Sequence, residues 1–237
     1  MQNYCKTIGA LAAASALAAG NASAEVEFEL HTGYSTEYIF RGLDLGDDLT
    51  EVGIDAAYNT GALTTSAGVW AAFFGDTGTG NQIDSEVDLY TEAAYDFGYL
   101  TGAVGYIYYY NLGRLGADAQ EVYFSVSKEL YGFETSLTYF WDVAGSGIEN
   151  DGYMEAYAGY GYELNSCLTL NNGLTFGFLA EQGEFSHVQF RTSLDWAFSE
   201  NATLAPYVQY SRQLTDEAAY NSSKDELIAG TILAVSF

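Results

Sequence analysis

Residues 227–237 read Leu-Ile-Ala-Gly-Thr-Ile-Leu-Ala-Val-Ser-Phe. Successive side chains of a β-strand point to opposite faces. One face of this stretch carries Leu227, Ala229, Thr231, Leu233, Val235 and Phe237. The other face carries Ile228, Gly230, Ile232, Ala234 and Ser236. The pattern predicts a strand with one apolar face and one small or mixed face, ending on an aromatic residue.

The same two-residue alternation recurs along the rest of the chain. It predicts twelve strands, at residues 26–40, 50–58, 63–74, 86–97, 100–110, 121–130, 133–142, 153–164, 168–178, 187–198, 202–211 and 227–237. Tight turns are expected at 59–61, 98–99, 131–132, 165–166 and 199–201. Longer polar loops are expected between them, at 41–49, 75–85, 111–120, 143–152, 180–186 and 212–226. Short turns at one end and longer loops at the other are typical of membrane β-barrels, and an even strand number places both termini at the short-turn end.

Charged residues separate between the two faces of these strands. On the faces taken as outward the only charge is Lys128, near a strand end. The opposite faces carry Glu27, Glu29, Glu37, Glu51, Asp55, Glu86, Asp88, Glu92, Asp96, Glu121, Glu129, Glu134, Asp142, Glu155, Glu163 and Asp195. Aromatic residues, among them Tyr34, Tyr38 and Phe40, gather near the ends of the outward faces, as at a membrane–water interface. A Lys or Arg facing lipid at mid-depth costs about 2–4 kcal/mol, so the partition predicts an all-β, transmembrane, antiparallel up-and-down β-barrel of about twelve strands.

The first 24 residues have the pattern of a secretory signal peptide. Lys6 precedes a short run rich in Ala and Leu, and residues 22–24 read Ala-Ser-Ala, which fits a cleavage site. The apolar run is too short to span a membrane as a helix. We therefore expect residues 1–24 to be a signal peptide and residues 25–237 to form the barrel.

The composition excludes several classes of function. All 32 acidic residues follow residue 24, and the net charge of −25 excludes a basic surface for nucleic acid. Only Cys167 follows the signal, so neither an internal disulfide nor a cysteine zinc site is expected. Asp44, Asp47 and Asp48 lack a defined spacing of Ca²⁺ ligands. No metal and no cofactor are predicted.

Two segments resemble known outer-membrane proteins. Residues 33–42 read Gly-Tyr-Ser-Thr-Glu-Tyr-Ile-Phe-Arg-Gly, which is similar to the Ser-x-Tyr-x-Phe-Arg-Gly opening strand of TorF-type porins. Here Ser35 lies one residue further from Tyr38 than in that pattern. The final strand, with Phe237, Val235 and Leu233, resembles the closing strand that the barrel-assembly machinery recognises. The resemblance implies a porin in a bacterial outer membrane.

The inward acids allow two interpretations. They form either a pore lining that attracts cations or a set of ion pairs that plugs a narrow barrel. Cationic partners are few, namely His31, His187, Arg191, Arg41 and Arg114. Because unpaired carboxylates need water, a wet lumen is favoured. Inward glycines would leave it space, at Gly33, Gly53, Gly68, Gly105, Gly159, Gly161, Gly173 and Gly177. Inward rings would narrow it, at Trp70, Tyr90, Tyr109, Tyr123, Phe140 and Tyr157.

Six residues are predicted to line the pore. They are Asp55, Asp88, Glu155, Arg191, His187 and Glu37. Arg191 either acts as a selectivity point or neutralises neighbours such as Glu155. Arg41 is expected to pair with Glu51 across the first loop.

The sequence thus predicts an outer-membrane channel for passive diffusion of small cationic or neutral solutes, with its termini in the periplasm. One alternative is a structural, receptor or adhesin barrel without an open pore. Another is an outer-membrane enzyme, which is disfavoured because both histidines read as inward and no Gly-x-Ser-x-Gly motif occurs. No catalytic residue is assigned. The expected partners are the lipid bilayer, the barrel-assembly machinery and small solutes.

Overall fold

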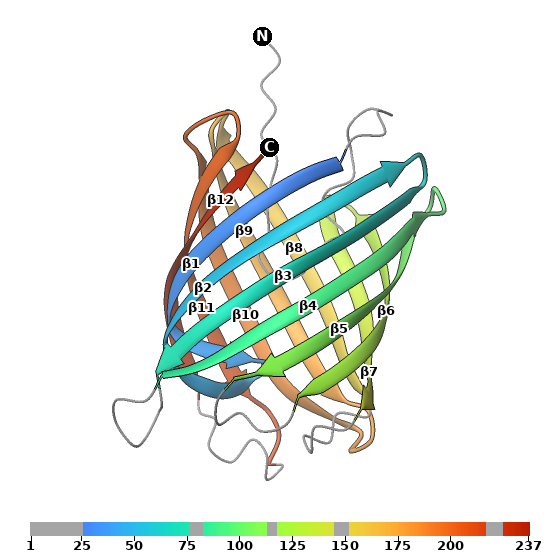
Figure 1. The fold of residues 1–237 in the computed structure, drawn as a ribbon, viewed down its shortest axis with the longest axis vertical. Helices are drawn as coiled ribbons and strands as arrows, with labels where there is room; N and C mark the ends of the chain where they lie inside the picture. Colours follow the sequence, from blue (N-terminus) through green and yellow to red (C-terminus); the bar gives the residue numbers. More distant parts are fainter. Residues whose placement is uncertain (1–25, 76–82, 113–117, 145–151, 217–224) are drawn as a thin grey trace.

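The computed structural model describes residues 26–75, 83–112, 118–144, 152–216 and 225–237, which form a closed barrel of antiparallel strands (Figure 1). The strands are β1 (Val26–Phe40), β2 (Leu43–Thr60), β3 (Leu63–Gly75), β4 (Ile83–Asp96), β5 (Thr101–Asn111), β6 (Ala119–Leu130), β7 (Phe133–Ala144), β8 (Tyr153–Asn165), β9 (Leu168–Leu179), β10 (Glu184–Ala197), β11 (Ala202–Gln213) and β12 (Glu226–Ser236). Each strand pairs with its sequence neighbours. The prediction of a twelve-stranded barrel is confirmed, and the predicted signal peptide lies outside the described residues.

No helix in the described ranges is long and apolar enough to cross a bilayer.

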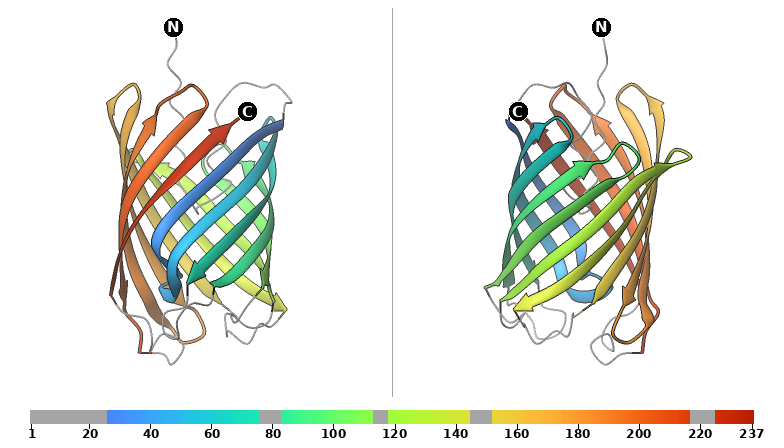
Figure 2. Two further views of the ribbon diagram at one scale, coloured as in Figure 1. Left: turned by 60° about the vertical axis from the view of Figure 1, so that its left-hand side comes forward. Right: turned by 90° about the vertical axis from the view of Figure 1, so that its right-hand side faces the viewer.

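The barrel closes where β12 meets β1, as the two views of Figure 2 show. The pairing of these strands runs from Glu29–Ser236 to Ser35–Gly230. Phe28 and Phe237 then exchange two main-chain hydrogen bonds of 3.0 and 2.9 Å, and their rings stack 5.9 Å apart. Closure pairs the edge strands, whose N–H and C=O groups lipid could not satisfy.

The division of faces predicted for β12 is confirmed. Ile228, Ile232 and Ala234 are buried on the inner face, whereas Leu227 and Phe237 are exposed on the outer face. Large apolar or aromatic side chains are exposed on the outer face of the other strands too, for example Leu30, Val52, Val69, Leu89, Val104, Phe124, Leu137, Tyr160, Leu174, Phe190 and Val208. An apolar surface that continues around the whole barrel is suited to contact with lipid.

The end of the barrel that holds Phe237 and the start of β1 carries the short turns (Figure 1). In the turn between β6 and β7, Tyr131 and Gly132 have φ values of 55° and 84°. Two positive φ values are characteristic of the type I′ turn, which suits a two-residue hairpin. The predicted loops at 75–85, 111–120, 143–152 and 212–226 lie partly outside the described residues, and the loop predicted at 180–186 is a shorter connection between Leu179 and Glu184.

The first connection is not the long polar loop predicted at 41–49. β1 ends at Phe40 and β2 begins at Leu43, so only Arg41 and Gly42 form the turn. Their φ values of 52° and 82° again give a type I′ geometry. Residues 43–49 therefore continue as strand, with Leu45 as an extra residue where the register shifts.

Candidate functional site

The end of the β1–β2 hairpin leaves the wall of the barrel and enters the lumen. β1 pairs with β12 only as far as Ser35, after which the Thr36 hydroxyl accepts a hydrogen bond from the main-chain N–H of Ala229. β2 pairs with β3 only as far as Asp47 and Gly75. The ribbon beyond these points is thus released from both neighbouring strands. We call residues 38–46 the hairpin tip.

Tyr38 and Phe40 in the hairpin tip face the interior, so the prediction that they face outward is wrong. Tyr38 is 6% exposed and packs against Trp70 and Phe74, with ring centroids 5.8 and 5.0 Å away. Phe40 is partly buried against the same cluster. The alternation breaks between Ser35 and Tyr38, both buried, because the ribbon bends inward where it loses β12.

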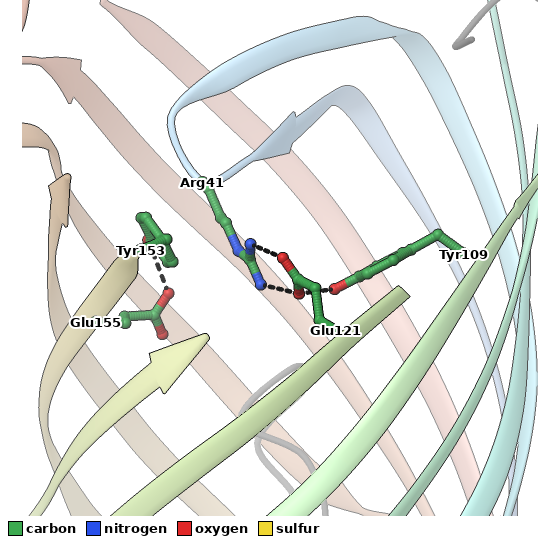
Figure 3. A network of polar contacts seen from close by, with 5 residues as sticks. All are labelled: Arg41, Tyr109, Glu121, Tyr153 and Glu155. Atoms are coloured by element: carbon green, nitrogen blue, oxygen red, sulfur yellow. Dashed lines mark hydrogen bonds and ion pairs between the residues drawn. The ribbon is translucent and has the colours of Figure 1, made fainter. Parts of the chain in front are cut away.

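Arg41, at the end of the hairpin tip, pairs with Glu121 on β6 (Figure 3). Its Nη1 and Nη2 each donate to one carboxylate oxygen at 2.7 Å. Tyr109 donates its hydroxyl to the same carboxylate at 2.8 Å. The side chains of Arg41 and Glu121 are 7% and 3% exposed. Removing either one would therefore leave the other as an uncompensated buried charge.

The expected contact between Arg41 and Glu51 is wrong. The hairpin tip carries Arg41 away from β2, and the indole Nε1 of Trp70 donates to Glu51 at 2.8 Å instead.

Aromatic rings surround the guanidinium of Arg41. Its Cζ atom lies 4.7 Å from the ring centroid of Phe40, 4.1 Å from that of Phe140 and 4.5 Å from that of Tyr153. Such contacts are attractive because the faces of aromatic rings are electron-rich. Burial is the largest single influence and lowers the pKa of Arg41, but Glu121 together with Tyr109 and Tyr153 outweighs it, so the pKa is raised above its usual value. The group is therefore a fixed cation.

His187 and Glu155, two of the predicted pore-lining residues, meet at Tyr153. The imidazole of His187 is 2% exposed, parallel to the ring of Tyr153 and 6.5 Å from it. The Tyr153 hydroxyl donates to Glu155 at 3.1 Å. A Cβ at Gly42 would lie 2.7 Å from the His187 ring, so the turn of the hairpin covers this histidine.

We expect Gly42→Ala to destabilise the barrel more than Gly132→Ala does. Both glycines hold the second position of a two-residue turn, with φ of 82° and 84°, so they share the cost of positive φ, about 1–2 kcal/mol. A new Cβ would meet His187 at 2.7 Å in the first case and Tyr160 at 3.7 Å in the second. Urea unfolding midpoints of the purified variants measure the difference. Equal midpoints would mean that the turn is not seated tightly on His187.

The other predicted residues are spread over the inner wall. Asp88 lies on β4 opposite Tyr109, and its buried Oδ1 has no hydrogen-bond partner among the described residues. Arg191 on β10 stacks on Tyr207, with Cζ 3.6 Å from the ring centroid. Glu37 lies at the base of the hairpin tip, opposite Asp47.

Tyrosine hydroxyls satisfy several inward carboxylates. Tyr90 donates to Asp55 at 2.5 Å, and Tyr123 donates to Glu92 at 2.8 Å. His31 Nε2 also lies 3.3 Å from the carboxylate of Asp55. Sequence reasoning counted only cationic partners and missed these donors, so a shortage of cations does not by itself require water at each acid.

These tyrosine rings lie against glycines of the neighbouring strands. Tyr90 is opposite Gly68 and Tyr123 is opposite Gly105 in the strand register. A Cβ at Gly68 or Gly105 would lie 2.4 or 2.1 Å from the facing ring. Gly68 and Gly105 therefore accommodate aromatic rings, whereas the sequence suggested that the inward glycines leave open space.

Comparison with known proteins defines the fold. No protein family model and no curated protein sequence match the chain. The COG4313 outer membrane channel from Pseudomonas putida F1 matches with a TM-score of 0.56 and 17% identity, over 90% of this chain and 95% of that chain. The NanC porin matches with a TM-score of 0.53 and 13% identity, over 89% of this chain and 98% of that chain. An active-site mutant of outer membrane phospholipase A from Escherichia coli matches with a TM-score of 0.53 and 11% identity, over 88% of this chain and 89% of that chain.

The chain thus has the fold of outer-membrane barrels, a class that includes channels and an enzyme. Identities this low show the fold alone, and one fold can host different functions. The narrower resemblance to TorF-type porins stays a prediction.

Proposed function

We propose that the chain is a channel of porin type in a bacterial outer membrane, where it passes small cationic or neutral solutes by passive diffusion. The observation that carries this proposal is the division of one closed barrel into an apolar outer wall and an inner wall rich in carboxylates. A field of carboxylates between low-dielectric walls concentrates cations. The channel and porin that share the fold support the same class of function.

The proposal includes an orientation and a route of assembly. With the termini in the periplasm, the hairpin tip lies at the external end of the lumen. The closing residues Phe237, Val235 and Leu233 serve the barrel-assembly machinery. We assign the narrowest part of the route to the hairpin tip, because Arg41 spans from β1 to β6 there.

A barrel closed by the hairpin tip is the second candidate, a receptor or structural barrel without an open pore. The buried ion pair between Arg41 and Glu121 favours it. An enzyme is not favoured, although the Ser186 hydroxyl lies 3.0 Å from Nδ1 of His187. Both residues are buried, and the turn at Gly42 covers the ring of His187, so neither side chain lies on the apolar outer wall.

The channel is expected to prefer cations. In a planar bilayer with a KCl gradient, the reversal potential should have the sign of a cation-selective pore. The preference should weaken with salt, because the Debye length falls from about 10 Å at 0.1 M to about 3 Å at 1 M. Neutralising Asp55, Asp88 and Glu155 together should reduce it further, since all three lie on the inner faces of their strands.

Glu181→Gln and Glu200→Gln are the matched controls, because these acids are exposed on connections between strands. They should leave the reversal potential nearly unchanged. An anion-selective reversal would contradict the proposal, and so would an absence of current both from the intact protein and from a variant without its hairpin tip.

A further inference from the structure

We propose that the wall site occupied by Arg41 is a binding site for solutes that carry a guanidinium or a similar organic cation, and that such a solute displaces the hairpin tip and opens the lumen. The second half of this inference rests on the proposed channel function. The first half concerns binding alone and is tested separately.

The groups that hold the guanidinium belong to the wall. Glu121 is on β6, Tyr109 on β5, Phe140 on β7 and Tyr153 on β8. A carboxylate that accepts two parallel N–H bonds fits a planar guanidinium better than it fits a round ammonium or Na⁺. The rings of Phe140 and Tyr153, 4.1 and 4.5 Å from Cζ, add cation–π contacts of the kind that recognise organic cations. A free solute of this class would find the same groups.

The site holds carboxyl groups beyond the one that Arg41 binds. Figure 3 shows Glu121 and Glu155 on opposite sides of the guanidinium. Only Glu121 is hydrogen-bonded to Arg41 in the view, and Glu155 accepts from Tyr153. Asp88 adds a third carboxylate near Tyr109, with its buried Oδ1 lacking a partner in the described part of the chain. A cation that enters this site therefore meets acidic side chains besides Glu121.

Arg41 behaves as a tethered ligand for this wall site. It is held on a two-residue turn, and the ribbon behind it has lost its pairing with β12 beyond Ser35. Tethering gives Arg41 a high effective concentration, so a free cation competes only when it is abundant. Displacement must also separate the packed rings of Tyr38 and Phe74 or bend the ribbon beyond them.

The test is chemical rescue of Arg41→Ala by ethylguanidinium chloride at millimolar concentration. The variant should unfold at a lower temperature than the intact protein, and ethylguanidinium should restore most of the loss, because a ligand that binds only the folded state stabilises it. Equal concentrations of NaCl should not. The double variant Arg41→Ala with Glu121→Gln should gain nothing. Rescue that is absent, or equal in the double variant, overturns the binding site.

Folding of the variant supplies a second measurement. Where Arg41→Ala alone gives no folded barrel, refolding with ethylguanidinium should recover the heat-modifiable form on gels, and refolding with NaCl should not. Recovery supports the site, and equal yields in both salts overturn it.

Current recordings distinguish binding at the wall site from displacement of the hairpin tip. In the intact protein, ethylguanidinium should raise the fraction of time spent open, whereas NaCl of equal ionic strength should not. If ethylguanidinium stabilises Arg41→Ala but does not raise the open fraction of the intact protein, the binding site is supported and displacement of the hairpin tip is overturned. If the intact protein conducts but ethylguanidinium does not stabilise Arg41→Ala, the channel function is supported and the binding site is overturned.

Discussion

Replacing residues 39–45 by Asn-Gly is expected to raise the single-channel conductance several-fold. Tyr38 and Gly46 are a cross-strand pair, so a two-residue turn placed between them can close the hairpin. The change removes Phe40, Arg41 and Leu43 from the lumen and keeps Tyr38 in its cluster. Water then reaches Glu121, so its carboxylate is not left as an unpaired buried charge.

A matched control shortens a connection on the rim of the same end. Leu179 and Glu184 are also a cross-strand pair, and residues 180–183 between them are exposed. Replacing these four residues by Asn-Gly should leave the conductance unchanged. Recordings of both variants and the intact protein in planar bilayers make the comparison. If the variant without its tip folds and conducts like the intact protein, the hairpin tip does not limit the route.

The two-residue alternation of apolar and polar side chains predicted the strands well because the two faces of a barrel wall lie in different environments. In β12 the inner residues Ile228 and Ile232 and the outer residue Leu227 follow the pattern to the end of the strand. β1 follows it only to Ser35. Past that residue the ribbon has protein on both sides, so the contrast between faces that alternation reports is gone.

The sequence predicts a loop at residues 41–49 because Asp44, Asp47 and Asp48 make this stretch polar. A signal for strand was present, since Leu43 and Leu45 lie two residues apart directly after Arg41 and Gly42. The polarity of residues 41–49 indicates a loop less reliably than the two-residue turn indicates a hairpin. Both residues of that turn, Arg41 and Gly42, adopt positive φ. A tight hairpin reaches further than a loop of equal length, and this reach brings Arg41 to the opposite wall.

The partner of Arg41 was beyond the reach of sequence reasoning. Glu121 is 80 residues away and is one of many inward acids, so alternation could place it on the inner face but could not select it. The contacts between tyrosine rings and facing glycines could not be predicted from the sequence for a similar reason. The facing of Tyr90 and Gly68 depends on the register between β3 and β4, and alternation within one strand does not fix the register between strands.

The largest loss of folded protein is expected from Leu233→Arg. Leu233 lies on the outer face of β12, paired with Thr32 on β1 and with Leu204 on β11. It is four residues before Phe237, which for a tilted strand places it about 10 Å from that end of the barrel, near mid-membrane. An Arg facing lipid there costs about 2–4 kcal/mol, in the strand that must pair on both sides to close the barrel.

Leu227→Arg is the matched control, because it makes the same substitution on the same face of the same strand. Leu227 lies at the opposite end of β12 and is 69% exposed. An Arg near the membrane interface costs only about 0–1 kcal/mol, so this variant should reach the outer membrane in near-normal amounts. Membrane fractionation and heat-modifiable mobility on gels measure folded protein for both variants. Equal and normal levels would mean that the outer face of β12 does not meet lipid, and recovery of the intact protein as a soluble periplasmic species would remove the membrane assignment altogether.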